Sequence, residues 1–188
     1  MKSGNRGYAF ALNLNKYENA HQNENCMGKF NLIFSLNGFY DGTALGPIRV
    51  GCIPMLECSK CGVAYYLPKF IKILESIIAE NLITSKGILN KKQIKFLRQY
   101  FDLTQEALGK MLDTDKYEIA KMESSKYARV MSVEKQIVMK LRFAKLLDIK
   151  SAETLYELSE PTDKEVKIVG EWFPKGEEEV KKLLKKVS

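Results

Sequence analysis

The sequence predicts an α+β protein, in which a small β-rich N-terminal domain precedes an all-α domain. Between residues 30 and 66, apolar residues alternate with polar or small ones, and turn residues separate the runs, which is typical of short strands. From residue 91 onward, apolar residues recur at three- and four-residue spacing, which is typical of amphipathic helices. We expect the first domain to cover 1–83 and the second 88–159, with a C-terminal extension at 160–188.

The composition is that of a soluble globular protein, with 45% hydrophobic and 28% charged residues among 188. No apolar run reaches the roughly 18–20 residues that would span a bilayer. The first residues, Met1 to Arg6, lack the apolar segment of a secretory signal. We therefore expect a cytoplasmic protein without a membrane contact.

The β-rich part begins with an alternating run from Phe30 to Leu36. Asn37-Gly38 follows and predicts a hairpin turn. Further short strands are expected at Phe39-Tyr40 and from Ile48 to Leu56. A second alternating run lies within the Asn-rich residues 1–25 and predicts a strand or a loose arm; its apolar members are Tyr8, Phe10, Leu12 and Leu14.

Cysteines mark the end of this region. The chain has four, Cys26, Cys52, Cys58 and Cys61, and in a cytosolic protein that number favours metal ligation over disulfides. The Cys-x-x-Cys-Gly run from Cys58 to Gly62 predicts a tight turn whose two thiolates can bind one tetrahedral zinc ion. Redox chemistry is disfavoured, because it would require a helix beginning at the first cysteine to lower its pKa. A strand-like run follows instead.

The residues Ile53 to Gly62, followed by Tyr66-Leu67-Pro68, resemble the end of the zinc-binding domain of MqsA/YgiT-type antitoxins. In that family a short strand runs into the second Cys-x-x-Cys-Gly, and a first Cys-x-x-Cys lies upstream, about where Cys26 stands. Here neither Asn23 nor Lys29, each three residues from Cys26, is a cysteine. The resemblance implies that Cys26 is the third zinc ligand, with His21 or Cys52 as the fourth.

Several alternatives for these ligands remain open. His21 can ligate through either ring nitrogen, or it can be a surface residue of the Asn-rich arm. Cys52 lies six residues before Cys58, about 20 Å away along an extended strand. We therefore prefer to interpret it as a small buried apolar residue. A degraded site that no longer binds metal is a further alternative.

Pro68 predicts the start of a helix. Ile71, Leu74 and Ile78 follow at helical spacing, in a stripe broad enough to pack on more than one side. The run Thr84-Ser85-Lys86-Gly87 predicts a linker.

The residues Leu103 to Glu123 predict two short helices joined by a tight turn. Thr104 can cap the first helix and Asp115 the second, with Glu118 in capping-box register. Gly109 leaves room for two helices that cross steeply. These features are typical of a helix-turn-helix, whose second helix enters the DNA major groove. The alternative is a plain αα-hairpin that binds nothing.

This run resembles the helix-turn-helix of Xre/Cro-type repressors, from the leading Leu103-Thr104-Gln105-Glu106 to the closing Glu123. The family usually has glycine in the turn where this chain has Asp113, which tolerates a left-handed backbone better than most residues. A helix from Lys91, which carries Ile94 and Leu97, would support the pair.

Two further predicted helices complete a five-helix pattern like that of the family. Ser132 caps the first of them, and the second covers 152–158. The spacing predicts these core-facing residues in the first: Val133, Ile137, Leu141, Ala144 and Leu147. In the extension, Trp172 and Phe173 are expected to pack back onto the domain, before a short helix from Glu177 to Val187.

The net charge of +7 has a definite location in the sequence. Residues 86–150 hold fifteen Lys/Arg and eight Asp/Glu, whereas residues 1–85 carry +2 and residues 151–188 carry −2. A basic domain gains affinity for the phosphate backbone by releasing counterions. The charge therefore supports DNA binding by the same segment that the helix pattern indicates.

The resemblance to Xre-type repressors implies the roles of individual residues. Tyr117 and Lys121 would read bases, with the small Ala120 between them allowing a close approach. Contacts to phosphates are expected from seven residues: Thr104, Gln105, Lys116, Ser124, Ser125, Lys126 and Arg129. Asp115 and Glu123 are expected to be structural, because bare carboxylates beside phosphate would weaken binding.

Together the two modules resemble an MqsA-type antitoxin. The resemblance implies a homodimeric repressor that binds a palindromic operator, regulates its own operon and neutralises a toxin protein. The alternative is a stand-alone Xre-family transcription regulator whose N-terminal domain senses metal or a ligand. An enzyme is disfavoured, since the sequence offers one histidine, no Ser/His/Asp constellation and no phosphate-binding loop.

Overall fold

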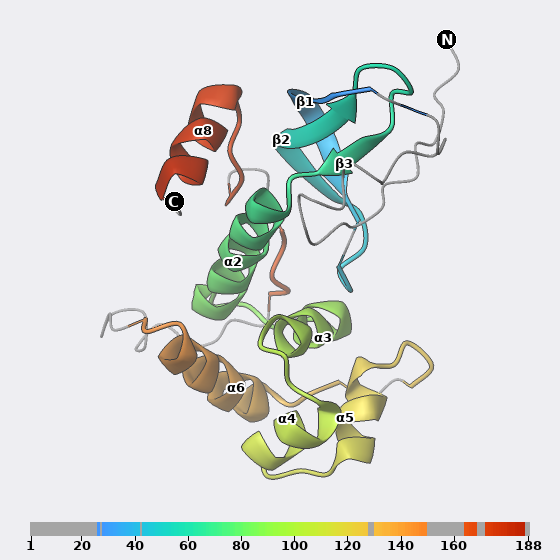
Figure 1. Ribbon diagram of the computed structural model, residues 1–188. Helices are drawn as coiled ribbons and strands as arrows, with labels where there is room; N and C mark the ends of the chain where they lie inside the picture. Colours follow the sequence, from blue (N-terminus) through green and yellow to red (C-terminus); the bar gives the residue numbers. More distant parts are fainter. Residues whose placement is uncertain are drawn as a thin grey trace. The chain divides into compact units, whose positions relative to one another are not determined.

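The computed structural model describes residue 26 and residues 28–41, 43–127, 130–149, 164–168 and 172–186. These residues form a three-stranded antiparallel sheet and six helices, which confirms the α+β class (Figure 1). His21, Arg129, the alternating run in residues 1–25 and the helix expected at 152–158 lie outside the described residues. No helix in the described part of the chain is both long and apolar enough to cross a membrane.

The chain divides into two compact units. The sheet unit contains the described residues of 1–39, 49–74 and 173–188, and the helical unit contains those of 40–48 and 75–172. These bounds differ from the ranges expected from the sequence. The loop between the first two strands groups with the helices, the C-terminal helix groups with the sheet, and helix α2 (Pro68–Thr84) contributes to both units.

The sheet has the strand order β1-β2-β3, with β1 at Phe30–Tyr40, β2 at Ile48–Cys58 and β3 at Ala64–Tyr66. Strands β2 and β3 pair antiparallel, with Met55 opposite Tyr66 and Glu57 opposite Ala64. Strand β2 is largely buried, which agrees with its central position in the sheet.

The hairpin expected at Asn37-Gly38 is wrong, because both residues lie inside the long strand β1. Asn37 has a φ of 54°, so the left-handed backbone that the sequence indicated is present but does not reverse the chain. A Cβ on Gly38 would lie 2.8 Å from a methyl carbon of Ile53, so this glycine allows a close approach of β2. The chain turns later, where Gly46 N–H donates to the carbonyl of Thr43 at 3.2 Å.

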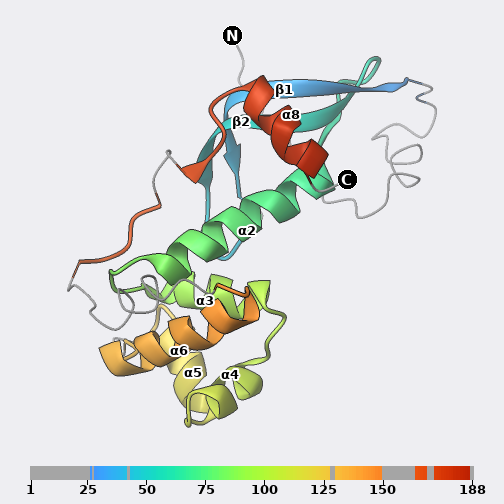
Figure 2. The ribbon, with the colours of Figure 1, turned by 90° about the vertical axis from the view of Figure 1, so that its left-hand side faces the viewer.

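Helix α8 (Glu177–Lys186) belongs to the sheet unit and lies beside β1 and β2 (Figures 1 and 2). The backbone of Pro174 and Lys175 passes so close to Gly51 of β2 that a Cβ there would lie 2.8 Å from a carbonyl oxygen. Phe173 and Val180 are buried, and Lys181 Nζ lies 5.6 Å from the ring centroid of Phe34. The C-terminal helix is therefore part of the sheet unit's core.

The helical unit contains α3 (Lys91–Tyr100), α4 (Gln105–Met111), α5 (Lys116–Glu123) and α6 (Val133–Leu146). The predicted helix starts are confirmed at Pro68, and at Ser132, whose side chain accepts from Lys135 N–H. The expected core stripe of α6 is displaced, since Val133, Ile137, Leu141 and Leu147 are only half-buried. The buried residues of α6 are Gln136, Met139, Lys140, Phe143 and Ala144.

Two polar residues account for the shift of the buried face of α6. The Gln136 amide accepts from Leu89 N–H at 2.7 Å and donates to the Met131 carbonyl. Lys140 Nζ donates to the carbonyls of Ser85 at 2.6 Å and Gly87 at 2.7 Å. These polar side chains lie in the core because they satisfy backbone groups of the α2–α3 connection, whose regular pairing is limited to a single bridge between Ile88 and Glu165. A search for apolar periodicity alone does not find them.

Three aspartates have a left-handed backbone directly after helix C-caps. Asp102, Asp113 and Asp148 have φ values of 51°, 50° and 55° and follow α3, α4 and α6. Glycine is the usual residue at this position of a helix end. Asp113, where the Xre family usually has glycine, is thus one of three aspartates that take this position after a helix.

Candidate metal centre and nucleic-acid interface

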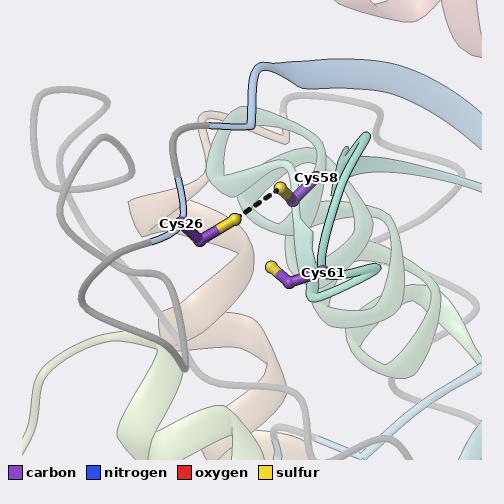
Figure 3. A group of neighbouring side chains, drawn as sticks. All are labelled: Cys26, Cys58 and Cys61. Carbon is purple, nitrogen blue, oxygen red and sulfur yellow. Dashed lines mark hydrogen bonds between the residues drawn. The ribbon is translucent and has the colours of Figure 1, made fainter.

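Three cysteines converge in the sheet unit. Cys26 Sγ lies 3.7 Å from Cys58 Sγ, and the sulfurs of Cys26, Cys58 and Cys61 all lie within 4.8 Å of one another. Their side chains point toward a common centre (Figure 3). None of the three forms a disulfide. Cys58 ends β2, Cys61 lies in the turn between β2 and β3, and Cys26 lies in the segment that leads into β1.

The turn after β2 is closed by its own backbone. Cys58 N–H donates to the Val63 carbonyl at 2.8 Å, and Gly62 N–H donates to the Cys58 carbonyl at 3.1 Å. Gly62 has a φ of 68°, which favours glycine and explains the Cys-x-x-Cys-Gly pattern. The turn thereby holds both of its thiols on one side.

The segment that carries Cys26 is held against this turn. Ser59 N–H donates to the Lys29 carbonyl at 2.9 Å. A Cβ on Gly28 would lie 2.4 Å from Cys58 Sγ, so only a glycine lets the backbone pass this close to the sulfur. The ring of Phe30 packs edge-on against Tyr65 with centroids 5.7 Å apart. These contacts bring Cys26 to the cysteine-containing turn, although Cys26 and Cys58 are 32 residues apart in sequence.

The electrostatics of the cluster favour a thiolate at Cys58. Burial raises the pKa of this thiol, but the backbone N–H groups of Cys61 and Lys60 donate to the sulfur and bring the pKa down to about 6. The N–H of Val63 favours the thiolate of Cys61, but burial and the neighbouring thiols outweigh it and raise that pKa. Burial, followed by the nearby charges of Cys61 and Cys58, raises the pKa of Tyr65.

This donor set fits a metal ion with tetrahedral thiolate coordination. Sulfurs bound to one zinc at about 2.3 Å would lie about 3.8 Å apart, close to the Cys26–Cys58 distance. Among the described cysteines and acids, no fourth residue joins the group, and the one histidine, His21, lies outside the described residues. Cys52, the alternative ligand considered from the sequence, does not lie in this group. It is fully buried in β2, where burial and then the charge of Glu177 raise its pKa.

The predicted pair of short helices is confirmed in the helical unit. Thr104 Oγ1 accepts from Ala107 N–H at 3.0 Å at the start of α4. At the start of α5, Asp115 Oδ1 accepts from Tyr117 N–H at 2.7 Å and Glu118 N–H at 2.9 Å. A Cβ on Gly109 would lie 2.7 Å from the Thr114 carbonyl oxygen. The glycine therefore lets the turn lie directly on α4.

The pair has a buried apolar stripe. Leu108 and Leu112 from the α4 side and Ile119 and Met122 from α5 are each less than a tenth exposed. The turn between them is closed by Thr114 N–H, which donates to the Gly109 carbonyl at 2.9 Å.

Glu123, at the end of α5, is structural as expected and joins three helices. Arg98 of α3 donates to its carboxylate through Nε at 2.6 Å and Nη2 at 2.9 Å, and to the Leu103 carbonyl through Nη1. Gln105 of α4 donates to the same carboxylate at 3.0 Å. The side chains of Arg98 and Glu123 are only 12% and 4% exposed. Apolar periodicity gives no signal for Arg98, and Gln105, which was expected to contact phosphate, is bound to Glu123 instead.

The exposed face of α5 carries part of the predicted base-reading set. The Tyr117 side chain is 67% exposed, and Lys116 Nζ lies 5.1 Å from its ring centroid. Lys121 pairs with Glu118 at 3.0 Å, so its charge is partly compensated within the helix. Ala120 is half-buried between them.

Lys91, for which the sequence pattern gives no signal, holds the loop after α5 in place. Lys91 Nζ donates to the carbonyls of Ser124 and Tyr127. Ser125 and Lys126 are exposed, and Lys126 N–H donates to Ser124 Oγ at 3.2 Å. Ser124, Ser125 and Lys126, which are expected to contact phosphates, thus lie in or beside an ordered turn.

Comparison with protein-family models, with curated proteins and with solved structures gave no match to the chain.

Proposed function

We propose that the protein is a sequence-specific DNA-binding repressor of transcription and that α4 and α5 act as its helix-turn-helix. One observation carries the proposal: the buried Glu123 carboxylate holds α5 against α3 and α4, while Tyr117 and Lys116 project from its exposed face. A rigid helix with an exposed polar N-terminal half is what insertion into a major groove requires. The +7 charge of residues 86–150 supports the same function.

Within this proposal Tyr117 and Lys121 read base edges, and Lys121 exchanges Glu118 for guanine acceptors on binding. Thr104, Lys116, Ser124, Ser125, Lys126 and Arg129 contact phosphates. Gln105 acts differently from the first expectation. Because its amide is bound to Glu123, its role is to position α5.

One such domain reads only a few base pairs, so we propose a homodimer on a palindromic operator. The proposed metal is zinc, with Cys26, Cys58 and Cys61 as ligands and His21 as the candidate fourth. Four donors would make this a closed structural site, which stabilises the turn and supplies no reactive position.

The more specific proposal is that this repressor is the antitoxin of a toxin–antitoxin pair. The pairing of a metal-binding sheet unit with a basic helical unit in one chain supports it, together with the resemblance of Ile53 to Gly62 to the MqsA/YgiT-type domain. A toxin partner would co-purify with the full chain at a fixed ratio. A chain that purifies alone when expressed with its neighbouring genes would favour a stand-alone regulator.

The test is a titration of the full chain onto its own promoter DNA and onto scrambled DNA, followed by fluorescence anisotropy. We expect Tyr117→Ala with Lys121→Ala to reduce the preference for promoter DNA by about 1–3 kcal/mol for each lost base contact. Lys126→Ala should weaken binding to both DNAs and lower the slope of log K against log salt by about 0.9.

Lys145→Ala is the matched control, because this exposed lysine lies at the far end of α6 and is not in the proposed interface. It should leave both affinities nearly unchanged. Unaltered promoter binding by the Tyr117/Lys121 double variant would exclude α5 as the recognition helix.

A further inference from the structure

The helical unit contains a pocket of about 350 Å³ that none of the proposed functions uses. The loop at Thr43 and Ala44 forms one wall, Glu75 of α2 a second, and α3 the third. Its volume falls within the range of sites that bind small molecules.

The walls of the pocket are held in place. The buried Tyr40 donates from its hydroxyl to Glu75 Oε1 at 2.7 Å, which ties the start of the loop to α2. Thr43 Oγ1 accepts from Leu45 N–H at 3.2 Å, and Gly46, with a φ of 83°, completes the turn. The pocket is therefore a formed feature of the unit and does not depend on a bound molecule to shape it.

The chemistry of the pocket is two-sided. Glu75 supplies a carboxylate, and the hydrogen bond from Tyr40 occupies one of its two oxygens. Lys95 and Gln99, one turn apart on α3, supply an ammonium group and an amide. Lys95 is exposed and forms no ion pair with another described residue, so its charge is available to a ligand.

An aromatic surface adjoins these polar groups. The rings of Phe96 and Tyr100 are stacked, with centroids 6.1 Å apart and an interplanar angle of 27°, and both line the pocket. Phe96 is buried, and a further edge-on contact between Tyr100 and Phe101 fixes the second ring. A flat apolar group can lie against this surface.

We propose that this pocket binds a free α-amino acid with an apolar or aromatic side chain. Glu75 receives the α-ammonium group, Lys95 and Gln99 donate to the α-carboxylate, and the side chain lies against Phe96 and Tyr100. Glu75 is half-buried and Lys95 and Gln99 are exposed, so each charged contact strengthens binding by about two- to fivefold and a zwitterion gains both contacts. The inference stands apart from DNA binding, since none of these residues belongs to the proposed interface.

The experiment is isothermal titration calorimetry of the full chain against each of the standard amino acids at millimolar concentration. The compound with the largest saturable heat is then compared with its deaminated and its decarboxylated analogue. We expect both analogues to bind about two- to fivefold more weakly, because each loses one charged contact at a half-buried or exposed wall of the pocket. The absence of saturable heat with every amino acid overturns the proposal, as does equal binding of the analogues.

Two variants assign the walls. Glu75→Gln should weaken binding of the amino acid and of its decarboxylated analogue, but not of the deaminated analogue. Lys95→Met should weaken binding of the amino acid and of the deaminated analogue, but not of the decarboxylated one. Glu80→Gln and Lys72→Met, which change exposed residues of α2 outside the pocket, are the matched controls and should bind as the wild type does. Equal losses in variants and controls, with circular dichroism unchanged, would overturn the assignment.

Discussion

The thiol cluster and the α4–α5 pair are assembled in opposite ways. The helix pair is held by contacts between residues close in sequence, such as Asp115 with Tyr117 and Gly109 with Thr114. The thiol cluster joins Cys26 to Cys58 across 32 residues, and a direct contact between two thiols contributes little stability of its own. The helix pair is thus held by contacts between protein residues, whereas the thiol cluster could be completed by a metal ion.

This difference has a consequence for stability. The buried ion pair of Arg98 with Glu123 links the helices without any added ion. The three thiols could instead be held together by a metal ion, which would neutralise the repulsion between neighbouring thiolates. The sheet unit should therefore depend on metal and the helical unit should not.

The largest effect is expected from removing the metal. Protein purified without chelator should contain about one zinc per chain, and chelation or Cys61→Ser should eliminate it, because the binding energy of a structural zinc is also folding energy. Hydrogen exchange should then rise throughout the segments around residues 28–30 and 56–66 and stay unchanged in α4 and α5. Cys52→Ala, at a cysteine outside the cluster, is the control and should keep its zinc. A metal content near zero in the untreated protein would remove the zinc site and leave the DNA-binding proposal standing.

The second effect is expected from Glu123→Ala. This change leaves the Arg98 guanidinium buried without its carboxylate, which should lower the free energy of unfolding of the helical unit by about 3–5 kcal/mol. Denaturant unfolding followed by circular dichroism measures the loss, and metal content should not change. Glu106→Ala breaks only an exposed pair with Lys110 and should have almost no effect on stability. Equal losses in the two variants would mean that Glu123 does not link the helices.

A smaller effect is expected from Lys140. Burial lowers the pKa of this lysine to about 8. Between pH about 8 and the ordinary lysine value of about 10.4, the unfolded chain binds more protons than the folded one, so the free energy of unfolding should rise with pH across that window. The gain is at most about 3 kcal/mol for a shift of this size. Denaturant unfolding at several pH values measures it, and Lys140→Met should flatten the dependence where Lys145→Met does not. A flat profile in the wild type would contradict a buried ammonium group.

The sequence predicts those features that depend on local patterns. The caps at Thr104, Asp115 and Ser132 were predicted correctly, because a capping side chain bonds to a backbone N–H only two or three residues away. The proline start of α2 and the Cys-x-x-Cys-Gly turn have equally local causes.

Features that depend on distant partners could not be predicted in this way. Asn37-Gly38 favours a turn in isolation, but the approach of Ile53 in β2 keeps it within a strand. The buried stripe of α6 shifts because Gln136 and Lys140 bind a backbone segment some 50 residues away. The role of Arg98 depends on Glu123, 25 residues further on. Apolar periodicity carries no signal for polar partners of this kind.

The aspartates that follow the helix ends leave the protein with stability in reserve. Asp102 and Asp113 are exposed, have left-handed φ values, and place a negative charge at the end of a helix whose dipole already favours a positive one. Glycine or asparagine adopts the same backbone at lower cost, so each replacement offers on the order of 0.5–1 kcal/mol. The added free energy of unfolding could compensate for destabilising substitutions on the proposed DNA-binding surface that would otherwise prevent folding.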